Sequence, residues 1–259
     1  MSASLLAALQ AKVLSVCTAL PVRPMLSGGW AVVHTIQAAV GEAALNGLCC
    51  AFSPDRADSK SVCTALHGNT LKLFDIETGD RLTLKDGVSV DVVSCCAFSP
   101  DGSIVVSGSS DTSLQLWEIK DGVNFDMLQG HNEAFSPEGH TAAVLCCAFS
   151  PDGRSICSGS NNKSLKLWDA TKFECERTLY GHGTIYCCAF SADSATVLSG
   201  SDDETLKLWS VATGECIRTF TGHNSTVAAC YFSPSDGSIL SGSWDSTLKL
   251  WDATTAVAR

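Results

Sequence analysis

The sequence contains no uninterrupted run of 18 apolar residues, and only 17% of its 259 residues are charged. A helix that spans a bilayer needs about 20 predominantly apolar residues, so no membrane-spanning segment is expected. No basic residue precedes Lys12, which argues against a secretory signal peptide. The formal net charge of −10 repels a phosphate backbone on average, so nucleic acid is not an expected partner. The expected partner is instead a protein with a neutral or basic surface.

Motifs that carry catalysis or bind cofactors are absent as well. The chain has no Gly-x-Ser-x-Gly elbow, no phosphate-cradling glycine-rich loop before a helix, and no paired carboxylates outside its repeats. It also has no Cys-x-x-Cys pair and no histidine at zinc-ligand spacing. We therefore expect no enzymatic activity, and no catalytic residue, metal site, cofactor or small-molecule substrate.

What the sequence does contain is a repeated pattern. Leu-Lys-Leu-Trp, with Gln for Lys in the first copy, occurs four times at spacings of 51, 41 and 42 residues, ending at Trp117, Trp168, Trp209 and Trp251. A second marker, Cys-Cys-Ala-Phe-Ser-Pro-Asp, begins at Cys95 and Cys146 in the same phase. Two markers that recur in phase indicate one structural unit copied along the chain.

Each unit is predicted to be a small antiparallel sheet. The apolar pieces between turns are too short for helices and are rich in Val, Leu, Ile, Phe, Trp and Cys, which is typical of strands. Residues 142–149 are apolar throughout, as in a strand buried on both faces, whereas residues 206–208 alternate, as in a strand nearer the outside. Four short strands per unit predict an all-β fold, a β-propeller of four-stranded antiparallel blades.

Gly-His, Ser-Gly-Ser-x-Asp and Leu-Lys-Leu-Trp-Asp occur in this order in several units, and from Leu48 to Asp252 the chain resembles the WD-repeat β-propeller family. The resemblance implies a hydrogen-bonded tetrad in each blade, made by a histidine, a strand serine, a turn aspartate and the tryptophan. Two units carry it whole, at His182, Ser199, Asp203 and Trp209 and at His223, Ser241, Asp245 and Trp251. A third has an amide in place of the carboxylate, at His140, Ser158, Asn162 and Trp168. These histidines are expected to be structural, with both ring nitrogens bonded.

Two further units depart from the tetrad pattern. The unit that ends at Trp117 keeps Ser107 and Asp111 but has no Gly-His in register. The unit before it has Gly68 and Phe74 in the positions of the aspartate and the tryptophan.

The repeat extends to the N-terminus in a degenerate form, because the sequence Ser-Val-Cys-Thr-Ala-Leu at residues 15–20 recurs at residues 61–66. About six blade units result, at residues 1–46, 47–92, 93–139, 140–181, 182–222 and 223–259. The last unit is too short for a full fourth strand, which in the family often comes from the N-terminus. Residues 1–14 suit either that strand or a short helix. A complete six-blade ring and an incomplete propeller with one open edge are both compatible with the sequence.

The resemblance also implies where a partner binds. In WD-repeat proteins the recurring contact positions lie on the face with the Gly-His loops, just before the tetrad aspartate and four and six residues before the phenylalanine of the inner strand. Here they include Ser110, Asn161, Asp202, Trp244, Leu145 and Tyr186. Tyr186 and Trp244 fall in adjacent units and are expected to form one patch with Asp202 between them. The alternative is that Trp244 merely covers a neighbouring loop.

Residues 131–139 form an insertion that places Phe135 among polar residues. Because Gly130-His131 is followed by Gly139-His140, the insertion is explained either as a local duplication or as a partner-binding loop.

The 14 cysteines lie mostly in adjacent pairs such as Cys49-Cys50 and Cys187-Cys188, in the predicted inner strands. Successive strand residues point to opposite faces, so a pair cannot easily share one metal ion. The expected role is that of a small apolar core residue, and a thiol ring that binds metal or senses redox state is the alternative. So many reduced cysteines favour the cytoplasm, or else the nucleus.

These observations predict a non-catalytic scaffold or adaptor that presents a propeller face to a protein or peptide within a multiprotein complex, for instance a signalling, ubiquitin-ligase or RNA-processing assembly. The alternative is an incomplete propeller module of a larger regulator or enzyme, which needs an additional blade or a partner to close.

Overall fold

The computed structural model describes residues 49–54, 61–66, 70–75, 81–83, 92–119, 123–127, 139–233 and 236–254. Every regular element in these ranges is a strand, and the strands form five antiparallel sheets. The predicted all-β fold is therefore confirmed. None of these ranges contains a helix that is long and apolar enough to cross a bilayer.

The sheets follow one another along the chain, and each is a meander of neighbouring strands. The first sheet contains β1 (Cys49–Phe52), β2 (Ser61–Leu66), β3 (Thr70–Asp75) and β4 (Arg81–Thr83). The second contains β5 (Val93–Phe98), β6 (Ile104–Ser109), β7 (Leu114–Glu118) and β8 (Val123–Met127). The third contains β9 (Val144–Phe149), β10 (Ser155–Ser160), β11 (Leu165–Asp169) and β12 (Cys175–Leu179). The remaining two sheets contain β13 (Ile185–Phe190), β14 (Thr196–Ser201), β15 (Leu206–Ser210) and β16 (Cys216–Phe220), then β17 (Val227–Phe232), β18 (Ile239–Ser243) and β19 (Leu248–Trp251).

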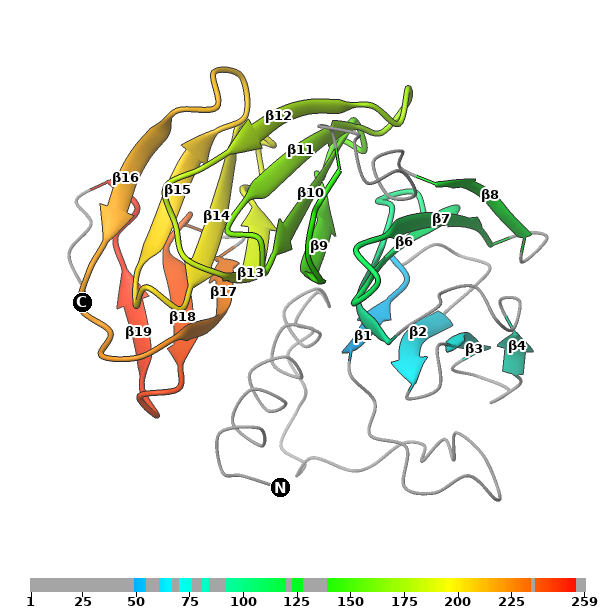
Figure 1. Cartoon of the computed structure of the whole chain (residues 1–259), viewed down its shortest axis with the longest axis horizontal. Helices are drawn as coiled ribbons and strands as arrows, with labels where there is room; N and C mark the ends of the chain where they lie inside the picture. Colours follow the sequence, from blue (N-terminus) through cyan, green and yellow to red (C-terminus); the bar gives the residue numbers. More distant parts are fainter. Residues whose placement is uncertain are drawn as a thin grey trace, which may run out of the picture.

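The five sheets are arranged as successive blades of a propeller. Figure 1 shows them fanned out in sequence order, from β1–β4 on the right of the view to β17–β19 at the lower left. The innermost strands of neighbouring blades, β1, β5, β9, β13 and β17, pack side by side. Four blades have four strands each, as predicted, and three strands are described for the last. The expected unit at residues 1–46 lies outside the described residues.

The apolar core lies between the blades. Leu165 and Leu167 of β11 pack against Ile185, Val197 and Trp209 of the following blade, and all five side chains are buried. The same arrangement recurs at the next interface, so each blade covers the apolar face of the one before it. Because sheets stacked in this way bury apolar surface on both sides, the strands read as nearly continuous apolar runs.

The glycine of the Ser-Gly-Ser motif makes this packing possible. A Cβ atom on Gly159 would lie 2.5 Å from Cγ2 of Ile185 and 2.6 Å from Sγ of Cys146. Gly200 is in the same situation, with Val227 and Cys187 as its neighbours. Any larger residue would therefore push away the inner strand of the next blade, which explains why glycine recurs here.

Candidate functional site

The last described blade is fixed by a complete chain of hydrogen bonds. Nε1 of Trp251 donates to Oγ of Ser241 over 2.8 Å, and that hydroxyl lies 2.7 Å from Nε2 of His223. Nδ1 of His223 lies 2.9 Å from Oδ2 of Asp245. An indole nitrogen can only donate and a carboxylate can only accept, so Nδ1 carries the imidazole proton and Ser241 donates to Nε2.

The third blade has the same chain with an amide at its end. Trp168 and His140 both contact Oγ of Ser158, at 2.8 Å each. Nδ1 of His140 is 3.4 Å from Oδ1 of Asn162, longer than the corresponding distance to a carboxylate in the last blade. The neutral amide therefore makes the weaker bond of the two.

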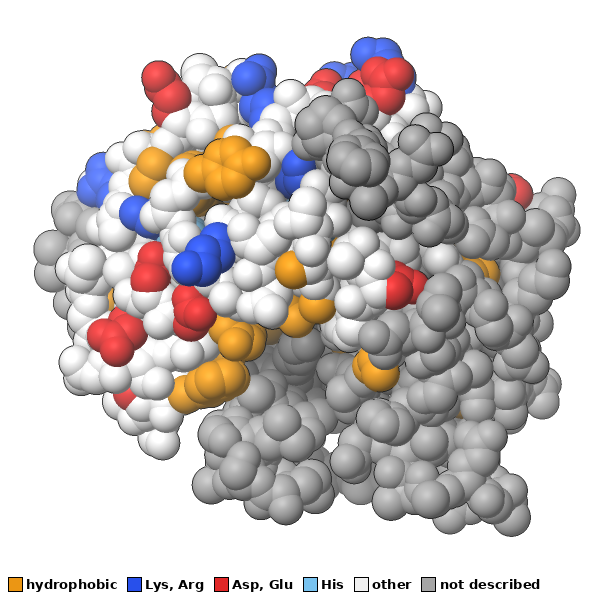
Figure 2. Space-filling model, viewed as in Figure 1, with side chains coloured by type: hydrophobic (Ala, Val, Ile, Leu, Met, Phe, Trp, Pro, Cys, Tyr) orange, Lys and Arg blue, Asp and Glu red, His pale blue; other side chains and the backbone are white. Residues whose placement is uncertain are grey.

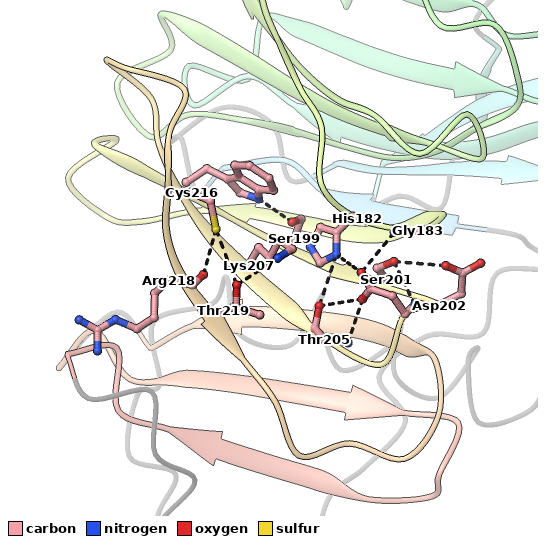
Figure 3. A network of polar contacts seen from close by, with 12 residues as sticks. His182, Gly183, Ser199, Ser201, Asp202, Thr205, Lys207, Cys216, Arg218 and Thr219 are labelled. Carbon is pink, nitrogen blue, oxygen red and sulfur yellow. Dashed lines mark hydrogen bonds and ion pairs between the residues drawn. The ribbon is translucent and has the colours of Figure 1, made fainter.

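The fourth blade departs from the expected pattern at one atom. Trp209 donates to Ser199 over 2.8 Å, and Nδ1 of His182 lies 2.9 Å from Oδ2 of Asp203. Figure 3 draws these two separate interactions, with Ser199 and His182 labelled. Nε2 of His182, however, is buried and has no hydrogen-bond partner. The expectation that both ring nitrogens are bonded is met at His223 and is wrong at His182. In the blade with Trp117, the indole likewise donates to Ser107, over 2.9 Å.

The tetrads leave negative charge on the face that carries them. Burial lowers the pKa of His182, so its imidazole is neutral near pH 7. Burial opposes ionisation of Asp203 and Asp245, but hydrogen bonds from Thr205 and Thr247, among others, lower both pKa values overall. Both carboxylates are thus ionised, and the ring beside Asp203 is uncharged. Elsewhere, in the view of Figure 2, acidic and basic side chains are interspersed.

The residue just before each tetrad aspartate or its counterpart is held by the same backbone bond in four blades. Its amide donates to the carbonyl of the residue that immediately precedes the inner strand of its own blade. The bonds run from Ser110 to Val92 (2.9 Å), Asn161 to Ala143 (3.0 Å), Asp202 to Thr184 (3.1 Å) and Trp244 to Thr226 (2.9 Å). The backbone is constant whereas the side chain differs in every blade, as expected of positions that are fixed by the fold and free to vary for binding.

The predicted contact position four residues before the phenylalanine of the inner strand coincides with a β-bulge. Ile185 pairs with Ser201 and Cys187 pairs with Gly200, so Tyr186 has no cross-strand partner. The register shifts in the same way around Ser94, Leu145 and Ala228. Bulges re-aim a side chain out of the regular alternation of a strand. The sequence positions alone gave no sign of this irregularity.

The structure brings Tyr186 and Trp244 into contact. Their ring centroids are 5.3 Å apart and the rings are inclined by 66°, an edge-to-face arrangement. Trp244 remains 37% exposed. Asp202 is exposed and lies close enough that its charge, after the larger effect of burial, raises the pKa of Tyr186.

The other predicted positions contribute less free polar surface. Oδ1 of Asn161 accepts a hydrogen bond from Thr184 of the next blade over 3.0 Å, and the hydroxyls of Ser110 and Ser94 are 3.4 Å apart. These side chains are therefore engaged within the propeller. Phe135 lies outside the described residues.

A cavity of about 170 Å³ opens between the inner strands. It is lined by Leu145, Tyr186, Ala228 and Tyr231 and by cysteines of four inner-strand pairs. Tyr231 was not among the predicted site residues. It occupies a position that is alanine in the other inner strands, such as Ala148 and Ala189, and this difference could have identified it.

The cysteines of this cavity meet in pairs across the blades. Sγ of Cys49 and Sγ of Cys96 are 3.4 Å apart, and Cys146 bonds to Cys188 of the next blade. Burial, followed by that bond, raises the pKa of Cys146. Within the described ranges, no group of three or more His, Cys, Asp or Glu side chains is placed to hold a metal ion.

Comparison with known proteins places these features in a family. A family model described as WD domain, G-beta repeat, matches residues 83–118, 129–169, 173–210 and 214–252, together more than half of the chain. It does not match the first described blade, although that blade has the same four-stranded topology.

Several relatives share part of the sequence. WD repeat and SOCS box-containing protein 1 of Xenopus tropicalis is 36% identical over 118 residues, which are 45% of this chain and 26% of that protein. U3 small nucleolar RNA-interacting protein 2 of Homo sapiens is 29% identical over 35% of this chain and 19% of its own length. Apoptotic protease-activating factor 1 of Danio rerio is 29% identical over 48% of this chain and 9% of its own length. The matches thus span about a quarter or less of these relatives. With its repeated matches, blades and tetrads, the chain belongs to the WD-repeat family.

Proposed function

We propose that the chain is a non-catalytic adaptor that holds a protein or peptide on the propeller face with the Gly-His loops, within a multiprotein complex. The contact between Tyr186 and Trp244 carries the proposal. Both side chains stand on backbone that the fold fixes, one at a bulge and one at a bonded turn. Partly exposed aromatic side chains on a rigid scaffold are the usual anchors of protein interfaces, because little conformational entropy is lost when they bind.

The polar residues nearby support binding rather than catalysis. His223 uses both ring nitrogens for bonds inside its own blade, and Asp245 accepts hydrogen bonds from His223, Thr247 and Asn224. Groups held in this way build the blade and are not available to transfer protons to a substrate. One relative, whose name joins WD repeats to a SOCS box, supports a role for this chain as one part of an assembly.

The sector formed by the fourth and fifth blades is the proposed contact surface. Asn161 and Ser110, in the third and second blades, use their side chains for bonds to neighbouring residues. Asp202 and Trp244 are exposed, as Asn161 is, but among the described residues neither side chain forms a hydrogen bond to a neighbouring blade. We therefore place the partner over Tyr186, Asp202 and Trp244, at the mouth of the cavity that Leu145 helps to line.

Replacement of both aromatic residues tests the proposal. The double variant Tyr186→Ala/Trp244→Ala should lose the main partner in affinity capture followed by mass spectrometry, while its melting temperature changes little. Ile217→Ala is the matched control, because Ile217 is 50% exposed but lies on β16, the strand farthest from the cavity. Undiminished capture by the double variant would refute the assignment of this surface.

A second candidate, an incomplete module that needs another blade, is favoured by the outer face of the last sheet. Leu248 and Leu250 of β19 are 62% and 41% exposed, whereas the equivalent Leu206 and Leu208 of β15 are 0% and 7% exposed. The latter pair is covered by the following blade. In this reading, the face of β19 is completed by a further blade or by a partner.

Solution mass distinguishes the two candidates. A monodisperse particle of 27.2 kDa supports the self-sufficient adaptor, and concentration-dependent association supports the incomplete module. In the latter case Leu248→Ser/Leu250→Ser should abolish association, and Ile217→Ser should not. Association that persists in the double variant would rule out β19 as the open face.

A further inference from the structure

We propose that the patch of Tyr186, Asp202 and Trp244 recognises an arginine side chain of the partner, whose guanidinium stacks on Trp244 and pairs with Asp202. This inference rests on the proposed function and specifies the chemistry of the partner. Three features of the patch support it: the aromatic pair, the carboxylate beside that pair, and the negative charge of the surroundings.

The aromatic pair presents a surface suited to a cation. An edge-to-face pair leaves part of each ring face open, and Trp244 remains 37% exposed although it contacts Tyr186. The face of an indole carries negative electrostatic potential and attracts a cation within about 6 Å of the ring centroid. Tryptophan is the strongest of the aromatic side chains in this respect.

Within the part of the chain that the structure describes, no cation pairs with the Asp202 carboxylate. The ion pairs among the described residues join Lys172 to Asp169, His182 to Asp203 and His223 to Asp245, and none involves Asp202. Its only bond in the described part of the chain comes from the adjacent Ser201 hydroxyl, at 3.3 Å. In Figure 3, Asp202 lies at one end of the polar network, next to Ser201 and Gly183. An exposed carboxylate beside an aromatic pair is complementary to a positively charged side chain.

The surroundings strengthen the negative potential. Asp202, Asp203 and Glu204 follow one another in the same turn and are all exposed. The partner of Asp203 is a neutral imidazole, because burial lowers the pKa of His182, so this carboxylate is not neutralised. The chain as a whole carries a net charge of −10, which attracts a basic partner at long range.

Arginine fits this combination better than lysine. Its guanidinium is planar, so it can stack on an aromatic face and at the same time present two N–H groups to one carboxylate. The lysine ammonium is a compact, strongly hydrated charge that cannot do both with the same geometry. Because backbone bonds already fix the turns of Asp202 and Trp244, little ordering is needed on this side of the interface.

Gly183 provides a variant that moves the carboxylate and keeps its charge. A Cβ atom at this position would lie 2.0 Å from Oδ1 of Asp202. The obstacle is the end of a flexible, exposed side chain, so Gly183→Ala should displace Asp202 while the blade stays folded. Asp202→Asn removes the charge and leaves the shape.

The test uses the full chain labelled with 5-fluorotryptophan and small amides as probes. The sequence has six tryptophans, and Trp244→Phe identifies the ¹⁹F resonance of Trp244. N-acetylarginine methylamide should shift that resonance saturably, and N-acetyllysine methylamide should bind more weakly. The citrulline analogue, which has the same shape without the charge, should produce no saturable shift. Asp202→Asn and Gly183→Ala should each weaken binding of the arginine probe by about fivefold, the size expected for an exposed charge pair.

The outcomes separate this inference from the proposed function. Equal responses to the arginine and citrulline probes, or unchanged affinity in Asp202→Asn, would overturn arginine recognition even if the double aromatic variant still loses its partner. Conversely, an arginine-selective response together with unimpaired partner capture by that variant would support the subsite and refute its role in holding the partner. In both cases the melting temperatures of the variants show whether the fold is intact.

Discussion

Trp209 and Ser199, ten residues apart in the chain, are joined by a hydrogen bond of 2.8 Å from the indole to the hydroxyl. Equivalent bonds of 2.8 to 2.9 Å occur in three other blades, at Trp117, Trp168 and Trp251. Each of these indoles is at most 3% exposed. The bond ties the third strand of a blade to its second, and the ring fills the space against the preceding blade, as Trp209 does beside Leu165 and Leu167.

Trp209→Ala should therefore destabilise the protein strongly. Truncation of a packed tryptophan to alanine typically costs about 3 to 5 kcal/mol of unfolding free energy, and here a buried hydroxyl also loses its donor. Denaturant unfolding monitored by circular dichroism measures the change. Trp244→Ala is the matched control, because the same truncation at a partly exposed site should cost far less. Equal losses in the two variants would show that Trp209 has no special role in its blade.

Gly159→Ala should also destabilise the fold, through the interface between the third and fourth blades. The added methyl group would overlap Ile185 and Cys146, both in inner strands that cannot retreat without moving their blades. Overpacking of this kind typically costs about 1 to 3 kcal/mol. The control is Gly237→Asn, since no atom lies within 4 Å of a Cβ there and asparagine tolerates its positive φ of 68°. A melting temperature of Gly159→Ala equal to that of the wild type would mean that the blades are not tightly apposed.

The sequence predicted the fold well because the repeat supplies several independent copies of one signal. Turn, strand and tryptophan recur in phase, so an error in one copy is corrected by the others. The same averaging hides local differences. Residues 206–208 alternate as in a strand nearer the outside, yet the lysine of the equivalent piece in the preceding unit, Lys166, is only 2% exposed and donates to Oγ1 of Thr178 over 2.7 Å. Whether a strand face is covered depends on the neighbouring blade, which a two-residue period does not encode.

The candidate site was predictable by position but not by geometry. Subtracting the architectural residues left Tyr186, Asp202 and Trp244 as variable positions, and the backbone bonds show why they can vary. The contact between Tyr186 and Trp244 depends on a β-bulge that no spacing revealed. The unpartnered Nε2 of His182 was equally invisible, because His182 and His223 sit in nearly identical sequence motifs.

Acid should destabilise the protein in two steps. The pKa of His182 is lower in the folded state than its ordinary 6.5, so below about pH 6.5 the unfolded chain binds a proton that the folded chain does not, and stability falls. The pKa values of Asp203 and Asp245 are lower than 3.8 in the folded state, so their contribution is present above pH 3.8 and is lost as the pH falls through the folded values.

Melting temperatures measured between pH 8 and pH 3 check both steps. The profile should be flat at the alkaline end, decline below about pH 6.5 and decline again below pH 3.8. Asp245→Asn should reduce the second decline and leave the first in place. A profile that rises on acidification would contradict the assigned protonation states.

The cavity thiols should react slowly in the folded protein. Burial raises the pKa of Cys146. In Cys188 and Cys96 a bond with one neighbouring thiol lowers the pKa, but a bond with a second thiol and burial outweigh it and raise the pKa overall, so the reactive thiolate is scarce. Among the cysteines in the described ranges, Cys216 is exposed and should react first with iodoacetamide. Peptide mass spectrometry before and after denaturation gives the order of labelling, and Cys216→Ser controls for the fast phase. Rapid labelling of Cys146 in the native state would contradict its role as a core residue.

Asn162→Asp should stabilise the third blade. In the last blade a carboxylate lies 2.9 Å from Nδ1 of its histidine, whereas Oδ1 of Asn162 lies 3.4 Å from Nδ1 of His140. A hydrogen bond to a charged group is worth about 1 kcal/mol more than a neutral one, and the backbone amide of Ser164, which already donates to Oδ1, suits a carboxylate equally. The gain should be seen near pH 7 and vanish below the pKa of the new carboxyl, since the protonated acid is again neutral. Asn161→Asp, one residue earlier and outside the tetrad, is the control for added charge in the same turn. A gain of equal size in both variants would attribute the effect to charge alone and not to the bond with His140.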